Sequence, residues 1–329
     1  MISLEACARR VLHDYPPWLR GKLVFLGNHG GFSGARLWRL ETSLASYCLK
    51  AWATDARSPT ELRWIHDLLH RASRFAWMPR VVPTSGGATF VALQDRLWEI
   101  TTWMPGSANF ADAPSIPRLD AACAALAQLH QCWAPLSTSR DVCPAVLRRW
   151  DSWLIWQHLL QTGWTPLFSV RDPWTTHAGQ LWQRLQERIE EVPRRLTPWL
   201  VANVPIQPCV CDLWHDHVLF TGDRVTGLID FGSVKEDHVA VDLARLLGSL
   251  IADDAMLWKI GVSSYSRIHP VSDEAQRLAR DLDRTGTILA ATHWLRWLYH
   301  EGRTFDDPAA VCKRLTHLVR RLSLADDGG

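Results

Sequence analysis

The sequence predicts an α+β fold with two lobes, a small β-rich N-terminal lobe and a larger, mainly helical C-terminal lobe. Short apolar runs bounded by glycine and polar residues recur before residue 104 and are typical of strands. After the break at Met104-Pro105-Gly106, apolar residues recur at helical spacing, and only residues 209–230 interrupt them with short strands. We therefore expect one lobe over residues 1–104 and a second over residues 105–329.

The elements expected in the first lobe are strands around one helix. The strands are expected over residues 22–26, 35–40, 46–52, 80–82, 89–93 and 97–103. Ser58 and Pro59 open the helix, because serine can cap a helix and proline suits its first position. The helices of the second lobe are expected over residues 117–133, 143–160, 174–200, 239–251, 255–266, 272–300 and 308–324.

Composition narrows the class of protein. The 329 residues are 47% hydrophobic and 21% charged, as in ordinary globular proteins, and a net charge of +2 gives no argument for nucleic acid. No apolar run approaches the roughly 18 residues of a membrane span. Glu5 and then Arg9-Arg10 precede any apolar stretch, which is the wrong order for a signal peptide. Eight cysteines without CxxC spacing favour reduced thiols in a cytoplasmic protein. We expect a monomer or homodimer with no nucleic-acid or membrane partner.

Two aspartates eighteen residues apart each close a short apolar run. Asp212 follows Cys209-Val210-Cys211, and Asp230 follows Gly227-Leu228-Ile229. A carboxylate at a strand end is directed at solvent or ligand by a rigid scaffold, and functional residues concentrate at such positions. The pair therefore indicates a site.

With these aspartates, the chain from about residue 22 to 324 resembles the protein-kinase-like fold, and closest the aminoglycoside phosphotransferase/choline kinase group. Residues 210–217 stand at the family's H-G-D-x-x-x-x-N, residues 228–232 at its DFG-type motif, and residues 241–247 at the following helix. The resemblance implies a bilobal fold. It also implies a kinase that moves the γ-phosphoryl group of ATP or GTP in line to a hydroxyl of a small molecule, without a phosphoenzyme.

The resemblance also implies roles for three carboxylates. Asp212 is expected to be catalytic and to accept or orient the proton of the acceptor hydroxyl. Asp230 is expected to hold Mg²⁺, because a carboxylate is a hard oxygen ligand. Asp242 is interpreted as structural, bracing the catalytic loop.

The nucleotide site is implied in the first lobe. Gly30, Gly31, Ser33 and Gly34 lie where the family places its phosphate-covering loop, and glycine lets backbone N–H groups approach phosphate oxygens. Lys50 lies at the place of the family's lysine that contacts the α/β-phosphates. The alternative is an ordinary surface lysine.

Two further nucleotide contacts are implied by the resemblance. Glu61 is either the helix partner of Lys50 or only a residue that favours the first turn of its helix. Thr102, Trp103 and Met104 are the candidates for the hinge strand, whose backbone hydrogen-bonds adenine in the family.

Two positions depart from the family pattern. Val210 replaces a histidine, which alters loop bracing, and His217 replaces the asparagine that binds metal. Mg²⁺ prefers oxygen ligands, whereas imidazole suits softer ions such as Mn²⁺. Three alternatives follow for the metal. His217 could ligate it through nitrogen, Asp216 or another carboxylate could take the place of His217, or Asp230 alone could hold one ion. The remaining alternative is lost phosphoryl transfer, and the protein is then a pseudokinase that binds nucleotide or acts as a scaffold without turnover.

Aromatic residues and a histidine cluster leave further alternatives. Nineteen tryptophans spread along the chain favour core packing over ligand binding. The aromatic residues of one helix, Trp294, Trp297 and Tyr299, either pack or form a wall for a cationic substrate. The segment 215–217 (His-Asp-His) either hydrogen-bonds internally or forms a separate transition-metal site. The acceptor stays open, because the family acts on aminoglycosides, choline, homoserine, methylthioribose and ketosamines.

Overall fold

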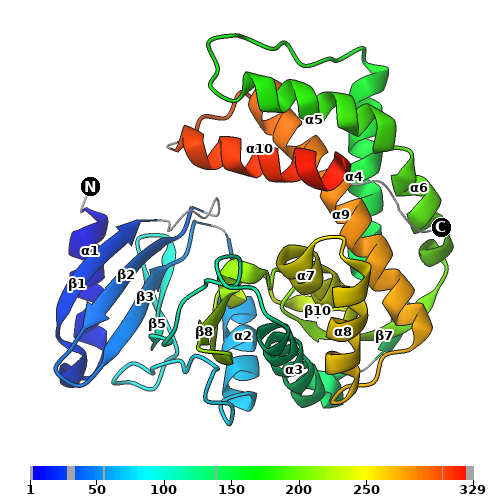
Figure 1. The fold of residues 1–329 in the computed structure, drawn as a ribbon. Coiled ribbons are helices and arrows are strands. Elements are labelled where there is room, and N and C mark those ends of the chain that lie inside the picture. The colour runs from blue at the N-terminus through cyan, green and yellow to red at the C-terminus, as the bar shows by residue number, and fades with distance from the viewer. Residues whose placement is uncertain (1–2, 28–33, 55, 138, 306, 324–329) are drawn as a thin grey trace. The chain divides into compact units, whose positions relative to one another are not determined.

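The structure, a computed structural model, describes residues 3–27, 34–54, 56–137, 139–305 and 307–323. The chain groups into two compact units, whose elements can be followed by colour in Figure 1. The first unit is Met1–Ala121 with His215–Phe231, and the second is Ala122–Trp214 with Gly232–Gly329.

The first unit is built on an antiparallel sheet of five strands in the order β1-β2-β3-β5-β4. The strands are β1 (Lys22–Gly27), β2 (Arg36–Glu41), β3 (Ser46–Ala51), β4 (Val91–Leu93) and β5 (Arg96–Thr102). The strand expected over 80–82 is wrong: Val81 makes only a single bridge to Thr101, and Pro83 follows without an N–H to continue the pairing. The register of β3 and β5 puts Lys50 opposite Glu99.

An N-terminal helix completes the core of this unit. Helix α1 (Leu4–Val11) was not expected, because eight residues are too few to show a clear helical repeat. Its residues Cys7, Ala8 and Val11 belong to the same buried cluster as Trp38 and Trp98 of the sheet. Two short 3-10 turns, Leu12–Asp14 and Pro17–Leu19, then lead into β1.

Helix α2 (Pro59–Arg71) begins where the sequence predicts it. Ser58 Oγ accepts the N–H of Glu61 at 3.2 Å, and a Glu61 carboxylate oxygen accepts the N–H of Ser58 at 2.8 Å. This reciprocal capping box satisfies backbone donors that the first helical turn leaves without partners.

A hairpin from the middle of the chain also belongs to the first unit. It consists of a 3-10 turn (His215–His217), β8 (Val218–Thr221) and β9 (Arg224–Leu228). The N–H of Leu228 donates to the carbonyl of Trp77 at 2.9 Å, and Ser107 pairs with Phe220. The packing therefore adds residues beyond 104 to the first unit, and the division into two domains at residue 104 stays a prediction.

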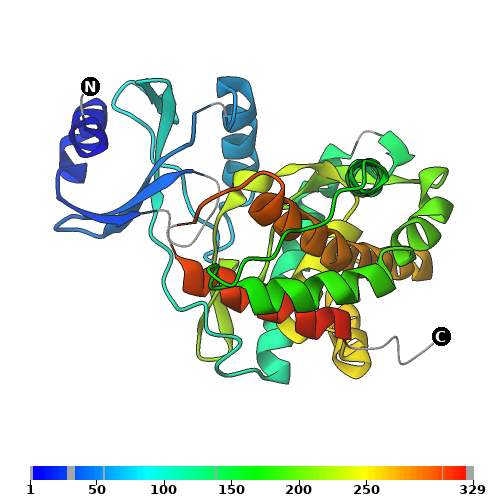
Figure 2. The ribbon, with the colours of Figure 1, turned by 90° about the horizontal axis from the view of Figure 1, so that it is seen from above.

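The second unit is mainly helical. Its helices are α3 (Ile116–Trp133, which starts in the first unit), α4 (Pro144–Gln161), α5 (Thr175–Arg188), α6 (Glu191–Leu196), α7 (Ala240–Ile251), α8 (Ala255–Ser266), α9 (Asp273–Tyr299) and α10 (Pro308–Ser323). Helix α9 contacts α4, α5, α6, α7 and α10, so it is the central element of this unit. Helices α5 and α10 lie side by side, as Figures 1 and 2 show.

A small antiparallel sheet accompanies these helices. Its strands are β6 (Ser139–Val142), β7 (Asn203–Cys209) and β10 (Lys235–Asp237), in the order β10-β7-β6. The outer strands β6 and β10 were not expected, because three or four residues are too few to show an alternating pattern. Strand β7 ends just before Val210 and so leads directly into the loop that carries Asp212.

The helix expected over residues 174–200 is wrong as one element. Helix α5 ends at Arg188, α6 follows, and a 3-10 turn occupies Thr197–Leu200. Pro193 and Pro198 lack the N–H that a continuous helix needs, and each lies in the first turn of the segment that follows a break.

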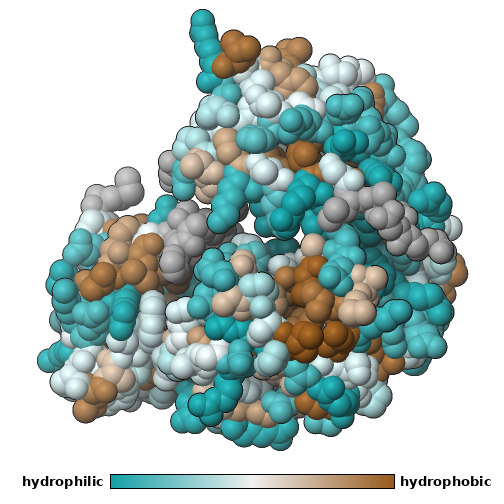
Figure 3. Space-filling model, viewed as in Figure 1, coloured by the Kyte–Doolittle hydropathy of each residue, from teal (hydrophilic) through white to brown (hydrophobic). Residues whose placement is uncertain are grey.

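Exposed apolar side chains and the apolar character of the helices show whether a described segment could cross a membrane. Apolar side chains gather over α7 and α8 on the face drawn in Figure 3, and Met256 in α8 is exposed. Within the ranges that the structure describes, no helix combines the length and the apolar character that crossing a membrane requires.

Candidate active site

Lys50 is held in the first unit by two carboxylates and one aromatic ring. Its Nζ lies 3.0 Å from Asp230 Oδ1 and 4.0 Å from the centroid of the Trp52 ring. The Lys50 side chain is only 14% exposed. Burial lowers the pKa of Lys50, but the charges of Asp230 and Glu99 outweigh it and the pKa is raised. Lys50 is therefore a fixed ammonium group rather than an ordinary surface lysine.

His217 converges on the same aspartate. Its Nε2 lies 3.8 Å from Asp230 Oδ2, and its carbonyl accepts the N–H of Ile229 at 3.0 Å. The backbone link ties the 3-10 turn of His217 to the end of β9, which carries Asp230. The structure thus brings together Lys50, Asp230 and His217, which lie far apart in the sequence.

The donor set around Asp230 fits a divalent cation. One carboxylate oxygen of Asp230 already pairs with a positive charge, the Lys50 ammonium group. The Asp230 carboxylate is therefore placed to face a cation. The imidazole of His217 adds a nitrogen donor, which Mn²⁺ accepts more readily than Mg²⁺ does. No third carboxylate, imidazole or thiol of the described residues clusters with this pair.

The histidine cluster next to this pair reads as a hydrogen-bonded turn. His215 Nε2 lies 3.3 Å from Asp216 Oδ1. The described residues at this turn form no group of three metal-ligating side chains. The separate transition-metal site therefore gains no support.

Glu61 makes the contacts of its own helix cap, and its pairing with Lys50 stays a prediction. Its carboxylate completes the capping box with Ser58 and pairs with Arg57 at 3.3 Å, because position N3 of a helix favours these contacts. Lys50 instead faces Glu99, which is 7% exposed on β5. Glu99 Oε2 lies 2.6 Å from Nε2 of His66 on α2, so helix and strand are linked through a glutamate on the strand.

The other predicted nucleotide residues are only partly described. Gly30, Gly31 and Ser33 lie outside the described residues, and Gly34 has a φ of +73°, which glycine adopts without strain. Thr102 is bound within the sheet, because its N–H donates to the carbonyl of Arg80 and its hydroxyl accepts the N–H of Arg80.

The last hinge candidate, Met104, is buried against the hairpin. A Cβ on Gly227 would lie 2.7 Å from the Cβ of Met104, so only glycine fits at 227. The adenine contacts of Thr102 and Met104 stay predictions.

Asp212 lies in the second unit, in the loop after β7. Its Oδ1 accepts a hydrogen bond from Nε of Arg245 on α7 at 2.9 Å. The side chains of Asp212 and Arg245 are 40% and 34% exposed, so both are accessible to a ligand. The preceding residue, Cys211, has a φ of +65°, and Asp230 itself has a φ of +58°. Strained backbone of this kind is typical of functional loops.

Asp242 braces the loop that carries Asp212, as the sequence predicts. Its two carboxylate oxygens accept the N–H groups of Val210 at 2.7 Å and of Cys211 at 2.6 Å. His130 Nε2 lies 2.9 Å from the same carboxylate, and its Nδ1 lies 2.6 Å from the hydroxyl of Tyr265. Asp242 and His130 are fully buried, so buried hydrogen bonds hold the backbone just before Asp212 in place.

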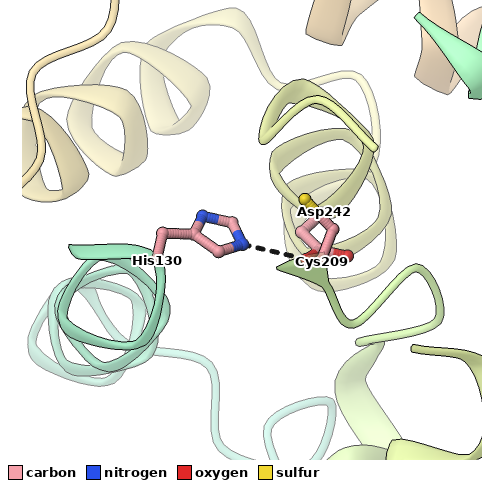
Figure 4. A group of neighbouring side chains, drawn as sticks. All are labelled: His130, Cys209 and Asp242. Atoms are coloured by element: carbon pink, nitrogen blue, oxygen red, sulfur yellow. Dashed lines mark hydrogen bonds and ion pairs between the residues drawn. The ribbon is translucent and has the colours of Figure 1, made fainter. Parts of the chain in front are cut away.

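Figure 4 shows His130, Cys209 and Asp242 converging from α3, β7 and α7. Burial raises the pKa of the Cys209 thiol well above its ordinary value, and the thiol donates to the carbonyl of Asp237. Metal binding requires a thiolate, and both oxygens of Asp242 already accept N–H groups. The cluster is therefore a hydrogen-bonded brace.

The aromatic residues of α9 pack within the second unit. Trp294 is buried, and its ring lies 5.4 Å from Trp297 and 5.3 Å from Phe305 between centroids. Tyr299 meets Phe168 in a T-shaped contact. Trp294 therefore packs in the core, whereas Trp297 and Tyr299 are half-buried and Phe168 is exposed.

Sequence reasoning missed four residues of these networks. Glu99, His66, His130 and Arg245 each reach the site through a tertiary contact rather than through a sequence motif. A charged residue in an otherwise apolar strand, such as Glu99 in β5, is a sequence signal that predicts a buried and paired charge.

Comparison with known proteins finds similar kinases and phosphotransferases. A homoserine kinase from Granulibacter bethesdensis is 27% identical over 268 residues, which cover 79% of this chain and 77% of the relative. A spectinomycin phosphotransferase solved with ADP and spectinomycin superposes with a TM-score of 0.74 at 11% identity, over 98% of each chain. An amicoumacin kinase solved with AMP-PNP and Ca²⁺ superposes with a TM-score of 0.63 at 15% identity, over 98% of this chain and 94% of that one.

These likenesses confirm the predicted fold class. Both solved structures are small-molecule kinases, and their likeness establishes the α+β, protein-kinase-like fold of this chain. The sequence model of the phosphotransferase enzyme family matches residues 25–267, which is well over half of the chain. This protein therefore belongs to the phosphotransferase enzyme family.

Proposed function

We propose that this small-molecule phosphotransferase moves the γ-phosphoryl group of ATP to the hydroxyl of homoserine or of a closely related short hydroxy amino acid. The enzyme class follows from the family, and the curated relative that matches 79% of the chain is a homoserine kinase. The observation that carries the proposal is the Lys50–Asp230 pair in one unit together with the braced Asp212 loop in the other.

In the first unit, Lys50 and Asp230 are proposed to serve the nucleotide. Lys50 supplies a fixed positive charge for the phosphates, since its carboxylate partners hold it protonated. Asp230 and His217 would hold a divalent cation, Mg²⁺ or Mn²⁺, which when bound neutralises charge on the phosphates. Gly30, Gly31, Ser33 and Gly34 are proposed to cover the phosphates, with Thr102 and Met104 near adenine. The donor is ATP or GTP, and a solved neighbour binds AMP-PNP.

In the second unit, Asp212 is proposed to act on the acceptor. It accepts or orients the hydroxyl proton while a bond forms between the acceptor oxygen and the γ-phosphorus. The bond from that phosphorus to the β–γ bridging oxygen breaks, and the nucleoside diphosphate leaves. Asp242 and His130 contribute by fixing the backbone before Asp212.

The competing interpretation, a pseudokinase, rested on His217 in place of asparagine. No comparison favours it, since the similar proteins carry the names of kinases and phosphotransferases. The convergence of Lys50, His217 and Asp230 further supports a working site.

The proposal also covers where and how the protein works. Each of the eight cysteines is a free thiol, which supports a cytoplasmic location. The protein is proposed to act as a monomer or homodimer.

A transfer assay tests the proposed function. Labelled ATP is incubated with the protein and homoserine, choline, a ketosamine or an aminoglycoside, and phosphorylated product is separated. We expect transfer to homoserine to be fastest. Nucleotide binding without transfer to any acceptor would instead support the pseudokinase.

A further inference from the structure

We propose that Arg245 and Arg314, which share the ring of Trp214 beside Asp212, form a subsite for the carboxylate of the acceptor. The proposal rests on the proposed function and names its substrate class: short molecules that carry both a hydroxyl and a carboxylate. Within this class the hydroxyl meets Asp212 and the carboxylate meets the guanidinium groups.

The four side chains lie in the second unit and come from three elements. Asp212 and Trp214 are in the loop after β7, Arg245 is on α7, and Arg314 is on α10. The guanidinium carbon of Arg245 lies 5.3 Å from the centroid of the Trp214 ring, and that of Arg314 lies 5.4 Å from the same centroid. One indole thus carries two guanidinium groups, of which that of Arg245 bonds directly to the proposed base.

Arg245 has donors to spare for a ligand. A guanidinium carries five N–H donors, and Arg245 uses Nε for Asp212 at 2.9 Å. Among the described residues, no carboxylate other than Asp212 pairs with Arg245. The terminal nitrogens form the planar fork that suits a carboxylate. Because the Asp212 contact and the indole fix this fork in place, binding requires little further ordering.

Charge at this place selects among acceptor classes. Two guanidinium groups on one indole disfavour a polycationic acceptor and favour an anionic one. A hydrogen bond joins Asp212 directly to Arg245, so the groups that meet hydroxyl and carboxylate are adjacent. Only a short molecule can satisfy both at once.

The test compares two acceptors that differ only in charge. Homoserine and homoserine amide carry the same hydroxyl, but the amide lacks the carboxylate. In the native protein we expect a KM for homoserine about 10- to 100-fold below that for the amide, as for charge-assisted hydrogen bonds. Arg245→Gln should raise the KM for homoserine by about the same factor and leave the KM for the amide unchanged. Arg314→Gln should act in the same direction.

A matched variant controls for the loss of a stacked arginine. Arg280 on α9 lies 4.1 Å from the centroid of the Trp258 ring in the same unit. Arg280→Gln should leave the ratio of the two KM values unchanged. If Arg245→Gln weakens both acceptors equally, Arg245 only supports Asp212 and the subsite is overturned.

Calorimetry separates this inference from the proposed function. Titrating homoserine and its amide into the nucleotide-loaded protein measures binding without turnover. Carboxylate-dependent binding that Arg245→Gln removes would support the subsite even if no product forms, and the proposed function alone would fail. Transfer to 3-amino-1-propanol at least as efficient as transfer to homoserine would leave a phosphotransferase but overturn the subsite, as would equal affinity for the two ligands.

Discussion

At the scale of single residues, His217 is proposed to set the chemistry of a cation site. Its Nε2 lies 3.8 Å from Asp230 Oδ2. An imidazole nitrogen favours Mn²⁺ relative to Mg²⁺, because hard Mg²⁺ prefers oxygen.

We therefore predict that His217→Asn shifts the ratio of the Mn²⁺-supported rate to the Mg²⁺-supported rate severalfold toward Mg²⁺. Initial rates at saturating metal measure the ratio. His215→Asn is the matched control, since His215 lies in the same 3-10 turn but contacts Asp216. An unchanged ratio in the His217 variant would remove His217 from the metal site.

At this scale, local motifs made part of the site predictable. Lys50, Asp230 and Asp212 are predicted from their places at strand ends and in family motifs, and the structure brings Lys50 to Asp230. Glu99 was missed, because its position opposite Lys50 depends on the register of two strands that are separated by about forty residues.

The pairing of β3 with β5 has a consequence at the scale of elements. It places Glu99 next to Lys50, and His66 of α2 holds Glu99 from the other side. Neutralising Glu99 should loosen Lys50. Glu99→Gln is predicted to weaken ATP binding about tenfold, measured by calorimetry, since one charged neighbour of Lys50 is lost.

Glu61→Gln is the matched control for that variant. Glutamine can complete a capping box, so ATP affinity and stability should both stay near those of the native protein. Loss of affinity in Glu61→Gln but not in Glu99→Gln would show that the helix glutamate is the partner of Lys50 after all.

The start of α7 carries a buried histidine that couples folding to pH. His238 is 5% exposed, and its Nδ1 accepts the N–H of Ala240 at 3.2 Å. Burial lowers the pKa of His238 from 6.5 to about 4. The unfolded chain therefore binds this proton at a higher pH than the folded chain, so protonation favours unfolding.

We predict that stability falls as pH drops from about 6.5 to about 4, by on the order of 3 kcal/mol from this group. His238→Asn keeps an acceptor for Ala240 and should flatten that acid limb in urea unfolding at several pH values. His158→Asn, at an exposed position of α4, is the control. An acid limb of unchanged slope in the His238 variant would contradict the prediction.

Elements were predictable where local signals are strong. Ser58 and Pro59 fixed the start of α2, and alternating apolar runs fixed β1 to β3. Pro193, in the first turn of α6, is a local signal against one continuous helix. The short strands β6 and β10 form only because β7 lies between them. Pairing of that kind depends on tertiary structure, which no local pattern reports.

At the scale of the whole molecule, we propose that the two units carry different parts of one reaction. The first would hold Lys50 and Asp230 for the nucleotide, and the second would hold Asp212 for the acceptor. The chain belongs to the phosphotransferase enzyme family, and its activity is phosphoryl transfer to a small molecule. A change confined to Asp212 should therefore affect transfer and spare nucleotide binding.

Phosphoryl transfer by Asp212→Asn, measured together with its affinity for ATP, tests this division most directly. The account predicts that transfer from labelled ATP to homoserine falls by about 10²- to 10⁴-fold, because a positioned proton acceptor is lost. It also predicts that the Kd for ATP, measured by calorimetry on the same sample, stays within about twofold, a difference under 0.5 kcal/mol. Transfer at the native rate in Asp212→Asn would contradict the account, and so would an ATP affinity that falls as steeply as the rate.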